Sequence, residues 1–162
     1  MKVRKLLILI LFVGVAATLL WAADKVDGSY MVDGKTHALK YAYPVKEKIQ
    51  DKPCRAILFS ADPVAPENLK AGQDPFMVFS DLAREAKTQA VEVLFSDDKS
   101  IKSVRIYDKG FDGALQTGGN EKFTATKFDA TGIAGKITMD KPADFFKQTY
   151  QYNMTFDVAF PK

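Results

Sequence analysis

Hydrophobic and polar residues alternate along much of this chain with the period of two that is typical of strands. The stretch from Tyr150 to Phe160 shows the pattern most clearly, because nearly every second position is aromatic or aliphatic and most positions between them are polar. A strand of this kind has one face in a core and one face in water. We therefore expect Tyr152, Met154, Phe156 and Val158 to point inward.

A hairpin is predicted near the start of the alternating region. The segments 28–32 and 35–43 flank Asp33-Gly34, and this dipeptide suits the positive φ angles of a type I′ turn. The second arm carries four large side chains at alternate positions, which we expect on one face: His37, Leu39, Tyr41 and Tyr43.

Further strands are predicted in the middle of the chain. The apolar run 56–59 lies between Pro53 and Asp62-Pro63 and is typical of a central strand covered on both sides. The segments 91–95 and 101–107 predict a second hairpin, because β-branched and aromatic residues recur on both sides of a polar turn. Strands are also expected at 123–128 and 133–139.

One amphipathic helix is predicted over roughly residues 75–88. Asp74 can cap its first turn, Pro75 suits the first helical position, and apolar residues follow at intervals of three and four. A short helical turn is expected at 66–70. The segment from Asp108 to Asn120 contains four glycines and is predicted to be a long exposed loop.

These elements define a mainly β fold. About eight strands and one short amphipathic helix, with no alternation of strands and helices, favour an antiparallel β-sandwich. A closed, lipocalin-like β-barrel is the alternative, since it uses the same alternating strands.

The N-terminus has the three parts of a signal peptide. A basic start is followed by the apolar run Leu6–Leu20 and by the small residues Ala22 and Ala23. We therefore expect residues 1–22 to be a signal peptide and residues 23–162 to form a single β-rich domain. The expected location is the periplasm or the exterior of the cell.

An uncleaved membrane anchor is the alternative for the same segment. Leu6–Ala23 spans 18 residues, which is at the short end of what crosses a bilayer. Leu20 and Trp21 are large side chains close to the expected cleavage position, where small residues are usual.

Charge adds little after the signal peptide is removed. Without Lys2, Arg4 and Lys5, the 23 Lys and Arg residues fall to 20, which equals the number of Asp and Glu residues. A neutral mature domain without a basic stripe is not expected to bind nucleic acid. After cleavage no membrane partner is expected either.

Candidate chemistry is sparse, because the chain has one histidine and one cysteine. His37 lies among aromatic strand residues and is expected to be a hydrogen-bonded strand residue, while Cys54 is expected to be a small buried residue. These counts exclude a Cys/His zinc site, and the glycine-rich segment 110–120 lacks a phosphate-loop motif. We assign no catalytic, cofactor-binding or metal-binding residue.

Several segments resemble a loose group of small exported bacterial β-rich proteins without assigned biochemistry. They are the Gly-x-Tyr-x-Val-Asp-Gly-Lys hairpin at 28–35, Ala-Ile-Leu-Phe-Ser with a following Asp-Pro-Val at 56–64, Lys-Pro-Ala-Asp-Phe-Phe at 141–146, and Thr-Phe-Asp-Val at 155–158. The resemblance covers most of the expected mature chain. It implies an exported β domain and no particular active site.

The expected function is that of a non-enzymatic exported domain that binds a protein partner or a small ligand. The segment 108–120 and the turns near Asp62 and Asp97 are the expected carriers of a binding surface, since loops on a rigid scaffold often hold function. One alternative is a lipocalin-like carrier of an apolar ligand in an open barrel. Another is a hydrolase that uses two carboxylates across a cleft.

Overall fold

The computed structural model describes residues 24–49, 52–70 and 72–161, so the expected signal peptide at 1–22 lies outside the described residues. The described residues confirm a mainly β, antiparallel fold with one α-helix. Their elements are β1 (Asp24–Val32), β2 (Lys35–Ile49), β3 (Lys52–Ser60), η1 (Pro66–Leu69), α1 (Pro75–Arg84), β4 (Ala90–Phe95), β5 (Ile101–Asp108), η2 (Lys109–Phe111), β6 (Gly113–Thr117), β7 (Lys122–Asp129), β8 (Gly132–Thr138), β9 (Ala143–Phe145) and β10 (Gln148–Ala159).

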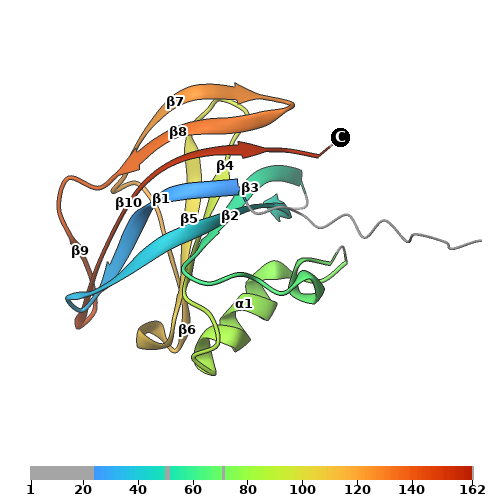
Figure 1. The fold of residues 1–162 in the computed structure, drawn as a ribbon. Coiled ribbons are helices and arrows are strands. Elements are labelled where there is room, and N and C mark those ends of the chain that lie inside the picture. Colours follow the sequence, from blue (N-terminus) through green and yellow to red (C-terminus); the bar gives the residue numbers. More distant parts are fainter. Residues whose placement is uncertain (1–23, 50–51, 71, 162) are drawn as a thin grey trace, which may run out of the picture.

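The strands belong to one sheet with the order β6-β5-β4-β3-β2-β1-β10-β8-β7, and β9 pairs with β10 off this path. Figure 1 shows that this sheet curls, so that β7 and β8 lie across from β4 and β5. One curled sheet of ten strands thus provides the two facing layers that a sandwich of about eight strands would have. Its end strands β6 and β7 are not neighbours in the described sheet, so the curl stops short of a closed barrel.

Aromatic side chains pack against one another across the interior of the curled sheet. Phe59 on β3 and Phe156 on β10 have ring centroids 4.9 Å apart, and Phe95 on β4 and Phe123 on β7 are 5.0 Å apart. Neither pair comes from neighbouring strands, so these contacts cross the interior. The main inner cluster consists of Tyr30, Val32, Leu39, Ala42, Ile57, Phe59, Val91, Val93, Phe95, Val104, Ile106, Leu115, Ile133, Ile137, Met139, Tyr150, Tyr152, Met154, Phe156 and Val158.

The helix α1 covers the opposite face of β2 to β6. Asp74 caps it by accepting a hydrogen bond from the Phe76 backbone N–H at 3.0 Å, as expected. It ends at Arg84, four residues before the predicted end, because Ala86 adopts a left-handed φ of 56° and Lys87 N–H bonds back to the Leu82 carbonyl. Beneath it lies the outer cluster, formed by Tyr43, Leu58, Phe79, Ala83, Ala90 and Tyr107.

The α-helix has ten residues, and none of the helices in the described part of the chain is long and apolar enough to cross a membrane.

The predicted inward face of the last strand is confirmed. Tyr152, Met154, Phe156 and Val158 are all at most 4% exposed, and Thr155 between them is exposed. The strand pairs with β1 on one side and β8 on the other, which places its apolar face in the centre of the inner cluster.

The predicted turn of the first hairpin is also confirmed, with positive φ at both residues of Asp33-Gly34. The prediction that the second arm has one apolar face is wrong. The pairing of β2 with β1 shifts between Leu39 and Tyr41, and a one-residue shift exchanges the two faces of a strand. Leu39, like His37, therefore faces the inner side, while Tyr41 and Tyr43 pack in or against the outer cluster.

The prediction of a long loop over 108–120 is wrong as well. Gly113–Thr117 forms β6, which pairs with β5 at the edge of the sheet. Leu115 is 2% exposed in the inner cluster, which stabilises this short strand despite the glycines around it. Gly113 has a φ of 112°, a conformation that glycine adopts readily, and so allows the chain to enter the strand from the left-handed residue before it.

Replacing Phe156 by Ala tests the role of the inner aromatic contacts. We expect it to lower the free energy of unfolding by about 3–5 kcal/mol, because it empties the position where β3, β4 and β7 meet β10. Thr155→Ala is the matched control on the exposed face and should cost about 0.5 kcal/mol or less. Urea denaturation measures both, and equal small losses would contradict the described orientation of β10.

Candidate functional site

Buried charged groups lie on the outer face of the sheet. Glu92 is in the middle of β4 with a fully buried side chain, and Arg105 is directly opposite it on β5. Tyr107 projects from the same face of β5 two residues further on. Glu92 Oε2 accepts hydrogen bonds from Arg105 Nη1 at 3.1 Å and from the Tyr107 hydroxyl at 2.6 Å.

A second carboxylate reaches the same guanidinium from β2. Arg105 Nη1 donates to Glu47 Oε1 at 2.7 Å, although β5 and β2 are separated by two strands. The side chains of Glu47 and Arg105 are only 6% and 12% exposed. We refer to Glu47, Glu92, Arg105 and Tyr107 as the ionic network.

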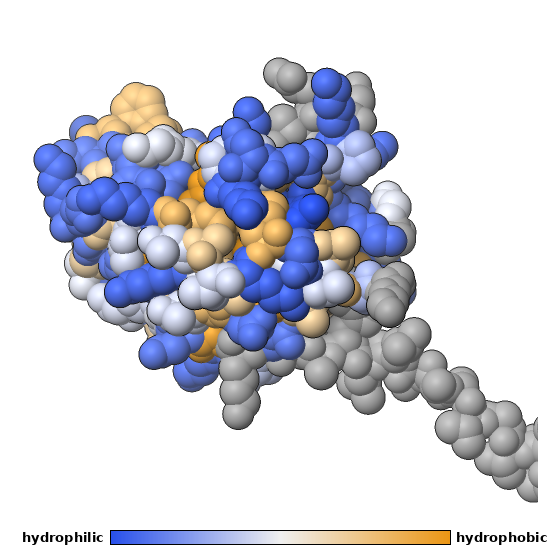
Figure 2. Space-filling model, turned by 90° about the horizontal axis from the view of Figure 1, so that it is seen from above, coloured by the Kyte–Doolittle hydropathy of each residue, from blue (hydrophilic) through white to orange (hydrophobic). Residues whose placement is uncertain are grey.

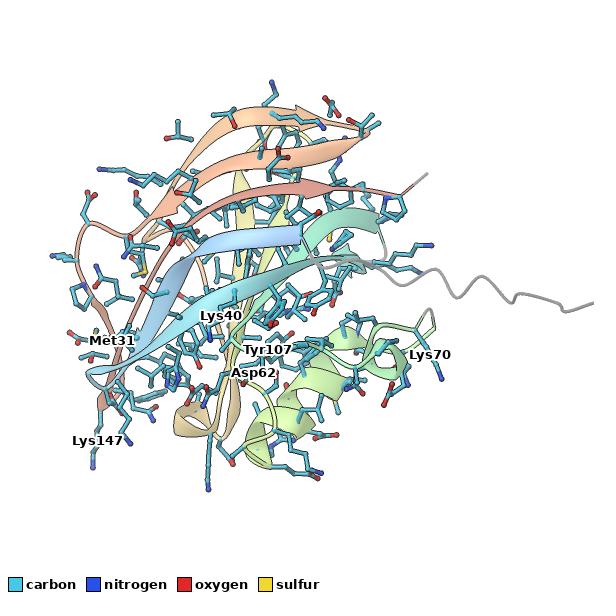
Figure 3. The ribbon with its side chains drawn as sticks, in the orientation of Figure 1. Met31, Lys40, Asp62, Lys70, Tyr107 and Lys147 are labelled. Carbon is cyan, nitrogen blue, oxygen red and sulfur yellow. The ribbon has the colours of Figure 1, made fainter. Side chains whose placement is uncertain are left out.

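The helix α1 shields this network from water. The ring of Phe76, in its first turn, lies 5.0 Å from the centre of the Arg105 guanidinium, a cation–π contact. Phe79, one turn later, packs 5.6 Å from the Tyr107 ring. Figure 3 labels Tyr107 where the sheet faces the helix. The charges therefore interact in a medium of low polarity, where pairing is strong and an unpaired group is costly.

Two polar atoms of the network lack a hydrogen-bond partner among the described residues. They are Glu92 Oε1 and Arg105 Nε, both of which are buried. Most buried polar atoms in folded proteins are hydrogen-bonded, so such atoms call for an explanation.

Burial changes the acidity of the network. It raises the pKa of Glu92 to about 7; the hydrogen bond from Tyr107 and the charge of Arg105 oppose this rise, and the negative charge of Glu47 adds to it. Burial and the adjacent Glu92 also raise the pKa of Tyr107. Glu92 is consequently an acid that can exchange a proton near neutral pH.

The network borders a cleft of about 970 Å³ at one end of the sheet, which we call the outer cleft. Its walls come from the end of β2, the start of β3, and the segment that leads into α1. Glu47, Cys54, Phe76, Arg105 and Gln116 all line it. A smaller hollow of about 130 Å³ adjoins it between β2 and the loop that precedes α1.

Cys54 and His37, the single cysteine and the single histidine of the chain, lie on opposite faces of the sheet. Cys54 is half-buried rather than buried, and it lines the outer cleft opposite Glu47. Burial raises its pKa to about 11, with the charges of Glu47 and Glu92 adding to the effect, so the thiol is protonated at neutral pH. His37 stacks on Tyr30 on the inner face, with ring centroids 5.0 Å apart.

The segments expected to carry a binding surface are not gathered in one place. Asp62 follows the end of β3, whereas Asp97 lines a hollow of about 270 Å³ next to the start of that strand. The Asp108 side chain is buried and accepts a hydrogen bond from the Tyr30 hydroxyl at 2.7 Å. From the segment 108–120, Gln116 is the residue that lines the outer cleft.

Sequence reasoning missed the residues of the ionic network. The alternation of Glu92 with Val91 and Val93 predicted a strand and gave no indication that this carboxylate is buried. A usable signal was the presence of Ala90 and Leu94 on the same face as Glu92, since a carboxylate between two apolar residues indicates a buried, paired charge. Nothing in the sequence pattern pairs Glu92 with Arg105, because that depends on strand register.

Comparisons of the chain with protein-family models, with curated proteins and with solved structures found no match. Within the described residues, no group of three or more His, Cys, Asp or Glu side chains is arranged to hold a metal ion.

The raised pKa of Glu92 predicts a defined pH dependence. Between its ordinary pKa of 4.5 and about 7, the folded chain keeps a proton on Glu92 that the unfolded chain has lost, so this group makes the free energy of unfolding fall as pH rises. Glu92→Gln keeps the shape and removes the titration. We expect the variant to be more stable than the parent above pH 7, by about 1–3 kcal/mol, with the difference vanishing near pH 4.5.

Urea denaturation at a series of pH values measures this difference. Glu85→Gln is the control, because Glu85 is an exposed carboxylate at the end of α1. A difference between Glu92→Gln and the parent that is constant from pH 4.5 to 8 would contradict the described burial of Glu92.

Proposed function

We propose that this protein is an exported, non-enzymatic domain that binds a small ligand in the outer cleft. The observation that carries the proposal is that Glu47 and Arg105, two members of the buried ionic network, line a cleft large enough for a small molecule. Export follows from the N-terminal sequence pattern alone.

The energetics of the network support a binding role. Replacing a buried ion pair by well-packed apolar residues is often neutral or stabilising, so burial of Glu47, Glu92 and Arg105 is weak support for a role in stability. A fixed guanidinium at the wall of a cleft suits ligand recognition, because it is held in one orientation before the ligand arrives.

Packing on the inner face favours this site over an internal carrier site. The side chains that would line a lipocalin-like cavity, such as Phe59, Tyr152 and Phe156, are at most 4% exposed and contact one another or their neighbours across the interior. A ligand inside the curl would have to displace these aromatic contacts. The outer cleft requires no such displacement.

A carboxylate-based hydrolase fits the geometry less well. Glu47 and Glu92 are close, but both bind the same nitrogen of Arg105, and Glu92 has a fully buried side chain. Hydrolysis of a glycosidic bond needs two carboxylates that flank the substrate, with room for the bond between them. Here the guanidinium occupies that position.

Fragment screening by two-dimensional NMR tests the proposed site. Fragments of positive, negative and zero charge are titrated into the chain as it is purified from the producing cells. We expect at least one class to shift the amide signals of Val45 to Glu47, Cys54 and Phe76 together. Shifts confined to inner residues such as Tyr152, or no shifts with any class, would contradict the proposal. Cell fractionation with sequencing of the N-terminus tests export separately.

A further inference from the structure

We infer that the outer cleft selects single-chain amphiphilic anions: molecules with one carboxylate, sulfonate or phosphate group attached to an apolar body. The inference rests on the proposed function, since it names the ligand class of that same cleft. It comes from the charges and the apolar walls that the fold brings together there.

The anionic side chains of the cleft already form ion pairs or hydrogen bonds within the protein. Glu47 is paired with Arg105 and accepts a further hydrogen bond from the Lys48 backbone N–H, and Asp74 caps α1. Both carboxylates line the cleft, but their charges are neutralised or directed at backbone donors. They leave little negative charge to attract a cationic ligand.

The lysines of the cleft, by contrast, form no ion pairs among the described residues. Lys46 and Lys48 line the cleft from β2, both are exposed, and neither has an ion-pair partner within the described part of the chain. Lys70 adds a third ammonium from the adjoining hollow, on the loop before α1 (Figure 3). Arg55, also in the cleft, makes its hydrogen bond to a backbone carbonyl, that of Asp129. The cleft is therefore locally positive although the expected mature chain is neutral.

Apolar side chains form much of the remaining wall. Val45, Pro53, Pro75, Phe76 and Phe160 all line the cleft, and they come from four separate segments of the chain. Ligand sites of this kind are mostly apolar with a few polar groups that fix orientation, and they range up to about 1,000 Å³. The volume of the outer cleft therefore fits one small amphiphile.

A polyanion fits the same surface poorly. Nucleic acids are held through many phosphate contacts along a basic stripe, whereas these cations surround an apolar cleft. Seen from above, the molecule has hydrophobic residues set among predominantly hydrophilic ones (Figure 2). The apolar wall is used only if the anion carries an apolar body.

Isothermal titration calorimetry with three ten-carbon probes tests the inference: decanoate, decanol and decyltrimethylammonium, each below its micelle concentration. We expect decanoate to bind more tightly than the ammonium probe by about tenfold or more, because Lys46 and Lys48 line the cleft and attract an anionic headgroup. The double variant Lys46→Glu, Lys48→Glu should abolish or reverse this preference. The double variant Lys109→Glu, Lys147→Glu, which changes exposed lysines outside the cleft, should leave it intact.

The possible outcomes distinguish a failure of the inferred ligand class from a failure of the proposed binding site. Equal binding of all three probes, with NMR shifts at the cleft, would overturn the charge selectivity and leave the binding site standing. Tighter binding of the ammonium probe would do the same. Binding to anionic lipid vesicles without binding of monomeric decanoate would overturn the small-amphiphile assignment. No binding of any probe at the cleft would overturn the inference, and the fragment titration then decides whether the proposed function stands.

Discussion

Strand β4 has water on neither side, and the rest of the structure follows from that constraint. All six of its residues are buried, so the sheet needs a cover on each face at this point. On the inner face the sheet covers itself by curling, with Phe95 of β4 packed against Phe123 of β7. On the outer face the cover is α1, which places Phe76 on Arg105 and Phe79 on Tyr107.

The two covers differ in chemistry. The inner face is a conventional apolar core, whose aromatic rings meet across strands that are not neighbours in the sheet. The outer face combines an apolar cluster with an ion pair that is removed from water, and replacing such a pair by well-packed apolar residues is often neutral or stabilising. The start of α1 and the loop before it stand away from the end of β2, and the outer cleft lies between them. The helix thus buries the ionic network and forms part of the wall of the candidate site.

The parts of the fold that were predictable depend on local pattern. Alternation identified β10, the Asp33-Gly34 turn followed from dihedral preference, and Asp74-Pro75 marked the start of α1. The errors arose where longer-range geometry decides. The register shift between β1 and β2 places Tyr41 and Tyr43 on the outer face, and β6 forms by pairing with β5 despite the glycines in and around it.

The candidate site was not predictable for the same reason. Glu47, Glu92 and Arg105 lie on three different strands, and only the order of strands in the sheet brings them together. His37 and Cys54, the single histidine and the single cysteine of the chain, were expected to be structural residues, and they lie on opposite faces of the sheet.

The central claim is that the ionic network serves the cleft rather than the stability of the fold. The quadruple variant Glu47→Met, Glu92→Leu, Arg105→Met, Tyr107→Phe replaces the three charges, and the hydroxyl that is hydrogen-bonded to Glu92, by apolar side chains of similar size. Its free energy of unfolding and its affinity for decanoate, measured on one preparation, separate the two roles. We expect a free energy of unfolding equal to or above that of the parent, with decanoate affinity reduced by about tenfold, because the variant lacks the oriented guanidinium N–H donors that Arg105 holds at the wall of the cleft. A loss of several kcal/mol in stability with unchanged affinity would contradict the account.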